Sequence, residues 1–200
     1  MKHGLPLPFY GLICAQSGAG KSNLLLNIIQ RSDNTYSHIY IVNQQHEEIY
    51  DYLQKKIPKG LTIVQSLNDL PSFTDLERDK KQTKLFIFDD MNLVKNQDYI
   101  ITMYKRGRKI LSSVLYLAQS YFATPIFIRK NVQFLFLLSI SGKKDLKLIL
   151  ETFNDVEPDK LMEMYKSATK KHLDFFKIHT VCRNLNQKYS HNFLDYFQLE

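Results

Sequence analysis

A short glycine-rich segment, residues 15–22, holds the side chains best suited to chemistry. It reads Ala-Gln-Ser-Gly-Ala-Gly-Lys-Ser, and it matches the phosphate-loop pattern G-x-x-x-x-G-K-[ST] from the second glycine onward. Glycine permits the backbone angles and the close approach that let backbone N–H groups surround phosphate oxygens. Ala15 replaces the first glycine, but it is small enough for the loop to turn. The predicted nucleotide-binding residues are Ser17, Gly18, Ala19, Gly20, Lys21, Ser22 and Asn23.

Two of these side chains have a specific predicted role. Lys21 is expected to reach the β- and γ-phosphates of a nucleoside triphosphate, and the Ser22 hydroxyl to ligate Mg²⁺. A Gly/Ser turn that precedes Lys-Ser by chance would contain the same residues. The position argues against chance, because the segment follows an apolar run and precedes a helical pattern.

A pair of carboxylates follows a second apolar run, residues 85–88. Asp89 and Asp90 are thereby predicted at the carboxyl end of a buried strand, where open α/β sheets bind ligands. Asp89 would hold Mg²⁺, and Asp90 would accept a proton from the attacking water or orient it. Asp90 is one methylene shorter than a glutamate would be, which shortens its reach as a base. A polar turn after a core strand is the alternative, which the phosphate loop makes less attractive.

Further polar groups lie downstream. Gln119 follows the apolar run 114–118 and is predicted to contact both the attacking water and the γ-phosphate. A glutamine at a strand end with no functional role would show the same pattern.

The segment 104–109 concentrates four positive charges around Gly107, including Arg106 and Arg108. An arginine there could stabilise charge on a transferring phosphoryl group of a neighbouring subunit, contact DNA phosphates, or simply be solvated. These three readings stay open.

Apolar runs and helical patterns alternate along the chain, which predicts an α/β fold with a mostly parallel central sheet flanked by helices. The expected strands are 9–15, 38–43, 61–65, 85–88, 113–118, 132–140 and 173–181, and the expected helices are 22–31, 47–56, 97–106, 125–129, 146–153 and 159–170. Residues 1–182 are expected to form one P-loop ATPase domain. Residues 183–200 turn polar and are expected to form a tail or a peripheral helix.

The composition of the chain indicates the kind of partner and the cellular location to expect. Lys and Arg number 27 against 20 Asp and Glu, a net charge of +7 that favours polyanionic partners. No apolar run reaches the roughly 18 residues that a membrane span requires. The first residues lack the apolar core and cleavage site of a secretory signal, so an intracellular protein is expected.

The ordered set of motifs resembles a known family. The phosphate loop, the run ending in Asp89-Asp90, the Arg-Gly-Arg cluster, then 117–121 and Pro125 with 128–131 occur in this order. This arrangement is similar to the poxvirus-type DNA-packaging ATPases, in the FtsK–HerA branch of RecA-like P-loop motors. The resemblance covers roughly residues 9–140, and the glutamine-ended run followed by Pro125 and Ile-Arg-Lys-Asn carries most of it.

The resemblance implies a homo-oligomeric ring, with a hexamer as the expected size, that uses ATP and Mg²⁺ to thread double-stranded DNA into a preformed capsid. Viral capsid or portal proteins are then the expected partners, and the host-cell cytoplasm at the assembly site or the virion is the expected location. The implied catalytic residues are Lys21, Asp90 and Gln119, the implied metal ligands are Ser22 and Asp89, and the finger would be Arg106, Arg108 or Arg129.

Other classes of P-loop protein share parts of this pattern. A small P-loop nucleotide kinase fits the size, although such kinases usually lack both the Asp-Asp strand and the glutamine-ended strand. A GTPase is disfavoured because no Asn-Lys-x-Asp motif occurs, and a transporter ATPase because no Ser-Gly-Gly-Gln-like signature occurs. A non-catalytic scaffold that binds nucleotide, or an FtsK–HerA-type DNA translocase not devoted to packaging, stays open.

Overall fold

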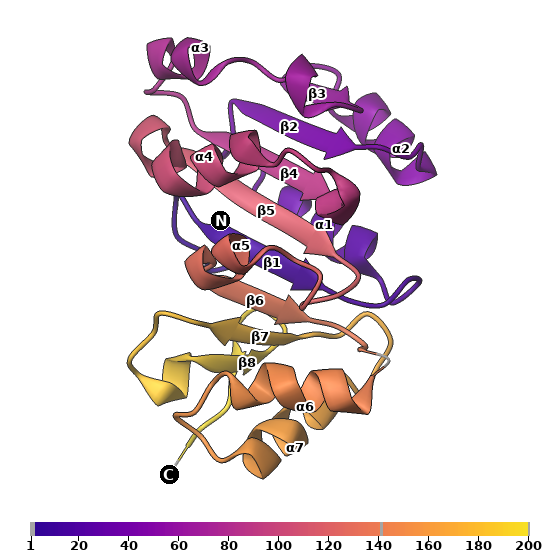
Figure 1. Cartoon of the computed structure of the whole chain (residues 1–200), viewed down its shortest axis with the longest axis vertical. Helices are drawn as coiled ribbons and strands as arrows, with labels where there is room; N and C mark the ends of the chain where they lie inside the picture. The colour runs from indigo at the N-terminus through magenta and orange to yellow at the C-terminus, as the bar shows by residue number, and fades with distance from the viewer. Residues whose placement is uncertain (1–2, 141, 200) are drawn as a thin grey trace.

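A single twisted sheet organises the molecule. The computed structural model describes residues 3–140 and 142–199. Within these residues, nine strands pair in the order β3-β2-β4-β5-β1-β6-β7-β8-β9 (Figure 1). Their bounds are β1 Tyr10–Cys14, β2 His38–Asn43, β3 Leu61–Val64, β4 Lys84–Asp89, β5 Ser112–Ala118, β6 Phe134–Leu137, β7 Phe176–His179, β8 Tyr189–His191 and β9 Asp195–Tyr196. The strands from β3 to β6 in this order are parallel, and β7, β8 and β9 pair antiparallel. The predicted mostly parallel α/β fold is confirmed.

Helices cover both faces of the sheet. They are α1 Lys21–Arg31, α2 Glu48–Lys56, α3 Phe73–Arg78, α4 Asp98–Arg106, α5 Ile126–Asn131, α6 Lys143–Glu151 and α7 Pro158–Ala168, and the 3₁₀ turns are η1 Leu67–Asp69, η2 Met91–Leu93, η3 Gly107–Ile110 and η4 Leu185–Gln187. Among the described residues no helix is long and apolar enough to cross a membrane. The sequence did not predict α3, which contains six residues and buries only Leu76.

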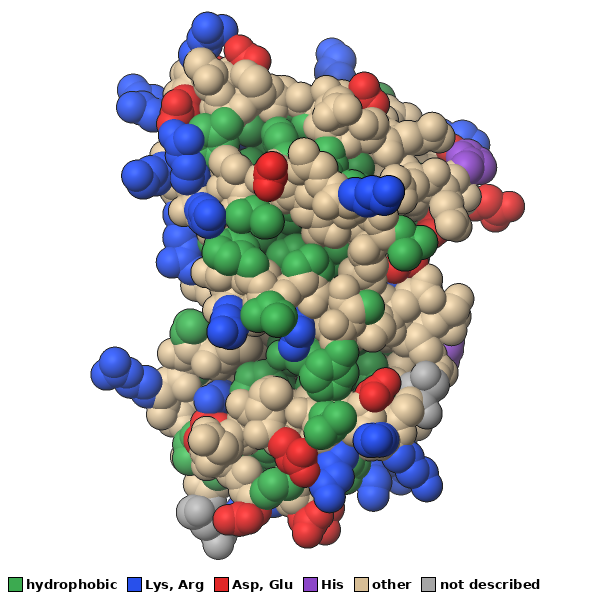
Figure 2. Space-filling model, viewed as in Figure 1, with side chains coloured by type: hydrophobic (Ala, Val, Ile, Leu, Met, Phe, Trp, Pro, Cys, Tyr) green, Lys and Arg blue, Asp and Glu red, His purple; other side chains and the backbone are tan. Residues whose placement is uncertain are grey.

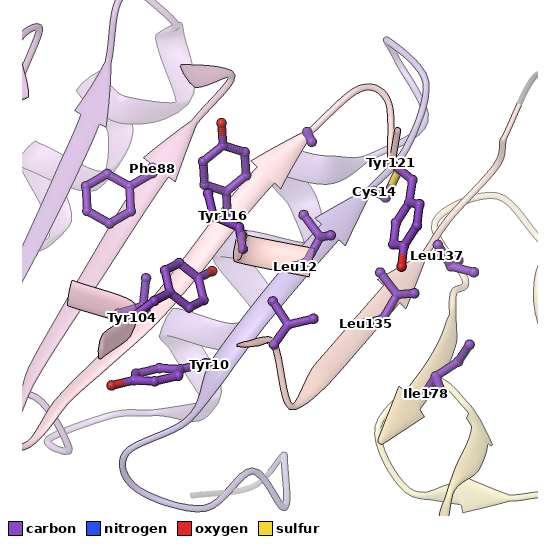
Figure 3. Packing of buried hydrophobic residues seen from close by; sticks show 14 of the residues in the cluster. Tyr10, Leu12, Cys14, Phe88, Tyr104, Tyr116, Tyr121, Leu135, Leu137 and Ile178 are labelled. Carbon is purple, nitrogen blue, oxygen red and sulfur yellow. The ribbon is translucent and has the colours of Figure 1, made fainter. Parts of the chain in front are cut away.

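Side chains along β4 point alternately to the two faces of the sheet, and this divides the core into two hydrophobic clusters. Leu85 and Ile87 join the cluster that contains the buried face of α1, while Phe86 and Phe88 join the cluster that contains α4, because successive strand residues point to opposite faces. Every residue of β4 and β5 is buried. Figure 3 shows the second cluster, in which Tyr104 of α4 packs beside Tyr10 and Leu12 of β1. These central strands are therefore rigid supports for whatever lies at their ends.

The C-terminal segment differs from the expectation. The sequence predicts a tail or peripheral helix after residue 182, but the described part forms η4 and then β8 and β9, which extend the sheet beyond β7. Tyr189 and Phe193 are buried and hold the hairpin against the domain. The polar residues that suggest a tail instead form the turns, where Asn192 adopts a left-handed φ of 53°.

Candidate nucleotide-binding site

The phosphate loop lies between β1 and α1, as the sequence predicts. Ala15 N–H donates to Ala118 O at 3.1 Å and Gln16 N–H donates to Ser139 O at 3.1 Å, so the loop is anchored to the ends of two neighbouring strands. Gly18 and Gly20 have φ of 74° and 96°, a region that glycine enters without a steric penalty. Ala15 is fully buried and fits without a glycine.

Parallel pairing brings the predicted side chains to the same edge. Cys14 is in register with Ala118, and Asp89 is in register with Leu117 on the other side of β5. The carboxyl ends of β1, β4 and β5 therefore meet, and the residues that follow them surround one cavity of about 340 Å³. The cavity is lined by Gln16, Ser17, Gly18, Gly20, Lys21, Ser22, Asn23, Gln45, Glu47, Asp89, Asp90 and Gln119.

Most predicted site residues thus come together. Ala19 is the member of the predicted phosphate-binding set that does not line the cavity, since it is buried in the cluster under α1. The Ala19 N–H donates to Gln16 O at 3.2 Å within the loop, so its predicted contact with phosphate stays a prediction.

Asp89 is almost completely buried, at 3% exposure. Its Oδ2 accepts hydrogen bonds from the Tyr50 phenol at 2.5 Å and from Asn43 Nδ2 at 3.4 Å. Burial raises the pKa of the Asp89 carboxyl to about 6, although the Tyr50 hydrogen bond acts in the opposite direction; the nearby Glu47 raises it further and Lys21 lowers it. A buried carboxylate of this kind gains most from a cation placed beside it.

Asp90 and Gln119 contact each other across the edge. The Gln119 amide Nε2 donates a hydrogen bond to Asp90 Oδ2. Asp90 has a left-handed φ of 52°, and its N–H donates to Leu117 O at 3.0 Å, so the chain turns sharply after β4. Aspartate tolerates this backbone region better than most residues. The turn points the second carboxylate toward the end of β5 rather than along β4.

Two functional side chains were missed from the sequence, Glu47 and Tyr50. The Ser22 hydroxyl donates to Glu47 Oε2 at 3.4 Å, and Glu47 lines the cavity. Both residues belong to the segment after β2, which is the neighbour of β4 in the sheet. The available signal was a carboxylate shortly after a buried strand, but it becomes meaningful only once the strand order is known.

The structure separates Arg106 and Arg108 from the cavity of their own chain. Arg108 lies over the ring of Tyr10 at 4.9 Å, and its N–H donates to the Tyr10 hydroxyl at 2.9 Å. Tyr10 is the first residue of β1, so Arg108 lies at the amino-terminal edge of the sheet. The phosphate loop begins at the other end of β1, roughly five residues away at about 3.3 Å per residue. Arg106 pairs with Glu77 at 2.9 Å and stacks on Phe73 at 4.1 Å. Figure 2 shows Lys and Arg side chains gathered along this edge, on the left of the view.

Arg129 lies on α5, which follows the loop after Gln119. Its guanidinium stacks on Tyr121 at 5.1 Å and on Phe122 at 5.5 Å, and its Nε donates to Thr124 O at 2.9 Å. It does not line the cavity either. None of the three predicted finger arginines therefore reaches the cavity of this chain.

A glycine-rich loop between β1 and α1, facing a carboxylate at the end of β4, defines a P-loop NTPase fold. The fold is similar to that of the genome packaging NTPase B204 from Sulfolobus turreted icosahedral virus 2 in complex with ATP-gammaS, with a TM-score of 0.62, 16% identity, and coverage of 86% of this chain and 92% of that chain. The family model for the Poxvirus A32 protein matches residues 5–182, and the chain belongs to that family. The resemblance predicted from the motifs is confirmed.

One curated relative and one further solved structure extend the comparison. The "DNA packaging protein OPG160" of Variola virus is 22% identical over 140 residues, which is 64% of this chain and 52% of the relative. The chain thus spans about half the length of the curated relatives it matches. The fold is also similar to that of the pCW3 conjugation coupling protein TcpA with ATPgS, with a TM-score of 0.62, 11% identity, and coverage of 95% of this chain and 61% of that chain.

Proposed function

We propose that this chain is an ATP-hydrolysing motor subunit that moves double-stranded viral DNA into a preformed capsid. One observation carries the proposal: Lys21 and Ser22 line the same cavity as Asp89, Asp90 and Gln119. Membership of the Poxvirus A32 protein family and the packaging function in the name of the Variola virus relative support the choice of DNA packaging.

The phosphate loop binds the triphosphate. Backbone N–H groups from Ser17 to Asn23 and the positive end of α1 attract the phosphate oxygens, and Lys21 adds a full positive charge. Ser22 and Asp89 would hold Mg²⁺, because a hydroxyl and a carboxylate are the hard oxygen donors that it prefers. Bound there, Mg²⁺ would neutralise negative charge on the β- and γ-phosphate oxygens.

Asp90 and Gln119 act on the attacking water. In this proposal the water oxygen bonds to the γ-phosphorus while the bond from that phosphorus to the β–γ bridging oxygen breaks. The proton of the water passes to Asp90, and Gln119, which already contacts Asp90, orients the water. Lys21 stabilises the charge that develops on the leaving ADP oxygen.

A second copy of the chain completes the site. Arg106 and Arg108 lie at the edge opposite the cavity, so they can serve only the cavity of a neighbour, and Arg129 is a third candidate. A head-to-tail arrangement of this kind closes into a ring, for which a hexamer is the proposed size. The same basic edge would contact DNA phosphates, and capsid or portal proteins would be the other partners, in the host cytoplasm or the virion.

The test is ATP turnover with and without double-stranded DNA, over protein concentrations that span assembly. The proposal predicts turnover that rises with both DNA and protein concentration and is abolished in Lys21→Ala. Lys160→Ala, an exposed lysine on α7, serves as the matched control and should behave as wild type. Turnover independent of DNA and concentration would contradict the motor.

A DNA translocase that is not devoted to packaging is the second candidate. The fold likeness to a conjugation coupling protein over 95% of this chain favours it. Stimulation by DNA in the absence of any capsid supports both candidates, whereas DNA uptake into empty capsids supports packaging alone. Phosphate transfer to nucleoside monophosphates would instead indicate a nucleotide kinase.

A further inference from the structure

The phosphate loop touches a segment from the far end of the chain. A Cβ placed on Gly20 would collide with Leu173 Cδ2 and would lie 3.8 Å from Leu173 Cα. Leu138 Cδ2 would be 3.5 Å away. Leu173 therefore lies directly against the glycine that precedes Lys21.

Leu173 is held in an unfavourable backbone conformation. Its φ is 73°, in the left-handed region that a leucine rarely enters, and the residue is 43% exposed. Such a residue persists only where the surroundings fix it. A turn precedes β7 here, in which Asp174 N–H donates to Lys171 O at 3.2 Å.

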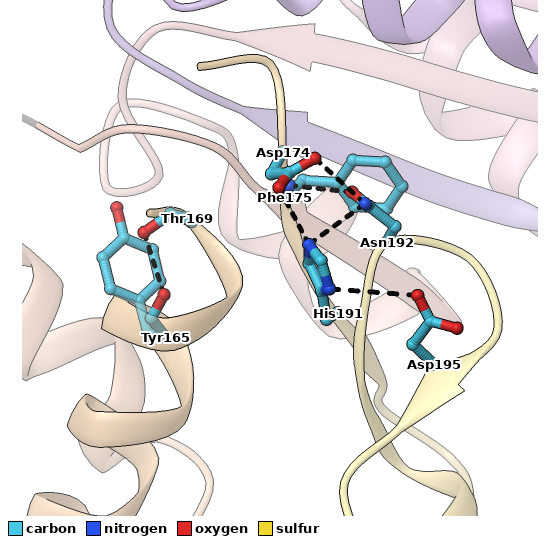
Figure 4. A network of polar contacts seen from close by, with 7 residues as sticks. All are labelled: Tyr165, Thr169, Asp174, Phe175, His191, Asn192 and Asp195. Atoms are coloured by element: carbon cyan, nitrogen blue, oxygen red, sulfur yellow. Dashed lines mark hydrogen bonds and ion pairs between the residues drawn. The ribbon is translucent and has the colours of Figure 1, made fainter. Parts of the chain in front are cut away.

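The surroundings that fix Leu173 come from the C-terminal hairpin (Figure 4). Asp174 accepts hydrogen bonds from Asn192 Nδ2 at 3.0 Å and from His191 Nε2 at 2.9 Å. Phe175 N–H donates to Asn192 Oδ1 at 3.2 Å, and Asn192 N–H donates to Phe175 O at 2.9 Å. Asn192 thus binds both residues that follow Leu173.

We propose that Leu173 is a positioning residue for the phosphate loop and that the β8–β9 hairpin, through Asn192 and Asp174, holds it there. The inference rests on the proposed nucleotide-binding function. Glycine has more backbone freedom than any other residue, so a loop built on Gly20 must lose that freedom when it binds phosphate. Leu173 restricts Gly20 in advance, which leaves less entropy to lose on binding. The hairpin lies beyond residue 182, where the family match ends.

The test is binding of an ATP analogue with a β,γ-methylene bridge, in the presence of Mg²⁺. Leu173→Gly relieves the strained φ but removes the contact, so it should bind the analogue at least about fivefold more weakly, the lower end of usual coupling between sites. Leu111→Gly is the matched control. Leu111 also has a left-handed φ, 51°, and is 38% exposed, but it lies before β5 at the opposite edge, and its variant should bind normally.

A second variant tests the role of the hairpin. Asn192→Gly keeps the left-handed backbone and removes the amide, so it should weaken binding when made alone. Because it acts through Leu173, it should add nothing to Leu173→Gly in the double variant. Backbone amides of residues 18–22 should exchange hydrogen faster in both single variants, while those of β4 keep their protection.

The outcomes separate this inference from the function it rests on. Failure of the wild type to bind the analogue would remove the proposed function. Normal binding by wild type and equal binding by Leu173→Gly would overturn the positioning role alone. Loss of protection in β4 as well would overturn it too, because Leu173 would then stabilise the fold in general.

Discussion

The phenol of Tyr50 donates a hydrogen bond to Asp89 Oδ2 at 2.5 Å, and both side chains are buried. Tyr50 comes from α2 and Asp89 from the end of β4, so the bond joins a helix on one face of the sheet to its carboxyl edge. Asn43, at the end of β2, donates to the same oxygen. The orientation of the proposed metal ligand is therefore set by two residues outside the recognised motifs.

Tyr50→Phe removes this donor and keeps the packing. We expect the free energy of unfolding to fall by roughly 1.5–3 kcal/mol, the usual contribution of a hydrogen bond to a charged group. Mg²⁺-dependent nucleotide affinity should fall as well, because Asp89 is less well oriented. Binding titrations at several Mg²⁺ concentrations measure this.

Tyr104→Phe is the matched control for that variant. The Tyr104 phenol also donates to a buried acceptor, Gly11 O, but neither residue lines the cavity. Because that acceptor is neutral, a loss of stability of about 1 kcal/mol with unchanged affinity is expected there. Equal affinity in both variants would rule out the orienting role of Tyr50.

Asp89→Asn should stabilise the protein in a pH-dependent way. Burial raises the pKa of Asp89 from 3.8 to about 6, so the folded protein binds this proton more tightly than the unfolded chain. Below pH 4 the Asp89 carboxyl is largely protonated in both the folded and the unfolded protein, so it does not lower the free energy of unfolding. Between pH 4 and 6 the stability falls as the pH rises, and above pH 6 the full penalty remains, roughly 3 kcal/mol for such a pKa change.

Denaturant unfolding of wild type and Asp89→Asn at pH 4 and pH 7, without nucleotide, checks this expectation. The variant should gain roughly 1–3 kcal/mol at pH 7 and little at pH 4. Because the wild-type carboxylate would bind Mg²⁺, the gain should be accompanied by loss of turnover. A variant less stable than wild type at pH 7 would contradict the raised pKa.

Gln119→Ala should separate hydrolysis from binding. The Gln119 amide contacts Asp90 rather than the phosphate loop, so its removal is expected to leave the affinity for the methylene analogue unchanged. Single-turnover hydrolysis should slow by about a hundredfold, the usual cost of losing one positioned donor. Gln119→Glu should be no better, since a carboxylate cannot donate the hydrogen bond to Asp90 and repels its negative charge. A parallel fall in affinity would instead assign Gln119 to nucleotide binding.

Mixing two inactive variants identifies the finger. Arg108→Ala keeps an intact phosphate loop, and Lys21→Ala keeps an intact arginine, so a mixed ring holds some complete sites. If Arg108 acts on a neighbour, the mixture should recover part of the turnover that neither variant shows alone. The same experiment with Arg106→Ala and Arg129→Ala ranks the three candidates. An arginine whose variant is inactive but never complemented is not the finger and acts through DNA contact or folding.

Local patterns were enough to predict much of this site. The phosphate loop can be predicted from its own residues and from the strand and helix patterns that flank it. Asp89 and Gln119 each follow a run of buried strand residues. Glu47 and Tyr50 were missed because their importance depends on β2 lying next to β4, a relation set by the sheet as a whole. The C-terminal strands were missed for a similar reason. β8 and β9 are short and polar in sequence, and they become strands only because β7 offers an edge to pair with.

The most direct test is a crystal structure with the methylene ATP analogue and Mg²⁺. We expect the loop 17–22 to hold the β- and γ-phosphates against Lys21, with the metal between Ser22 and Asp89. A nucleotide bound elsewhere, for example in the separate cavity of about 400 Å³ lined by Gln65 and Tyr99, would contradict it.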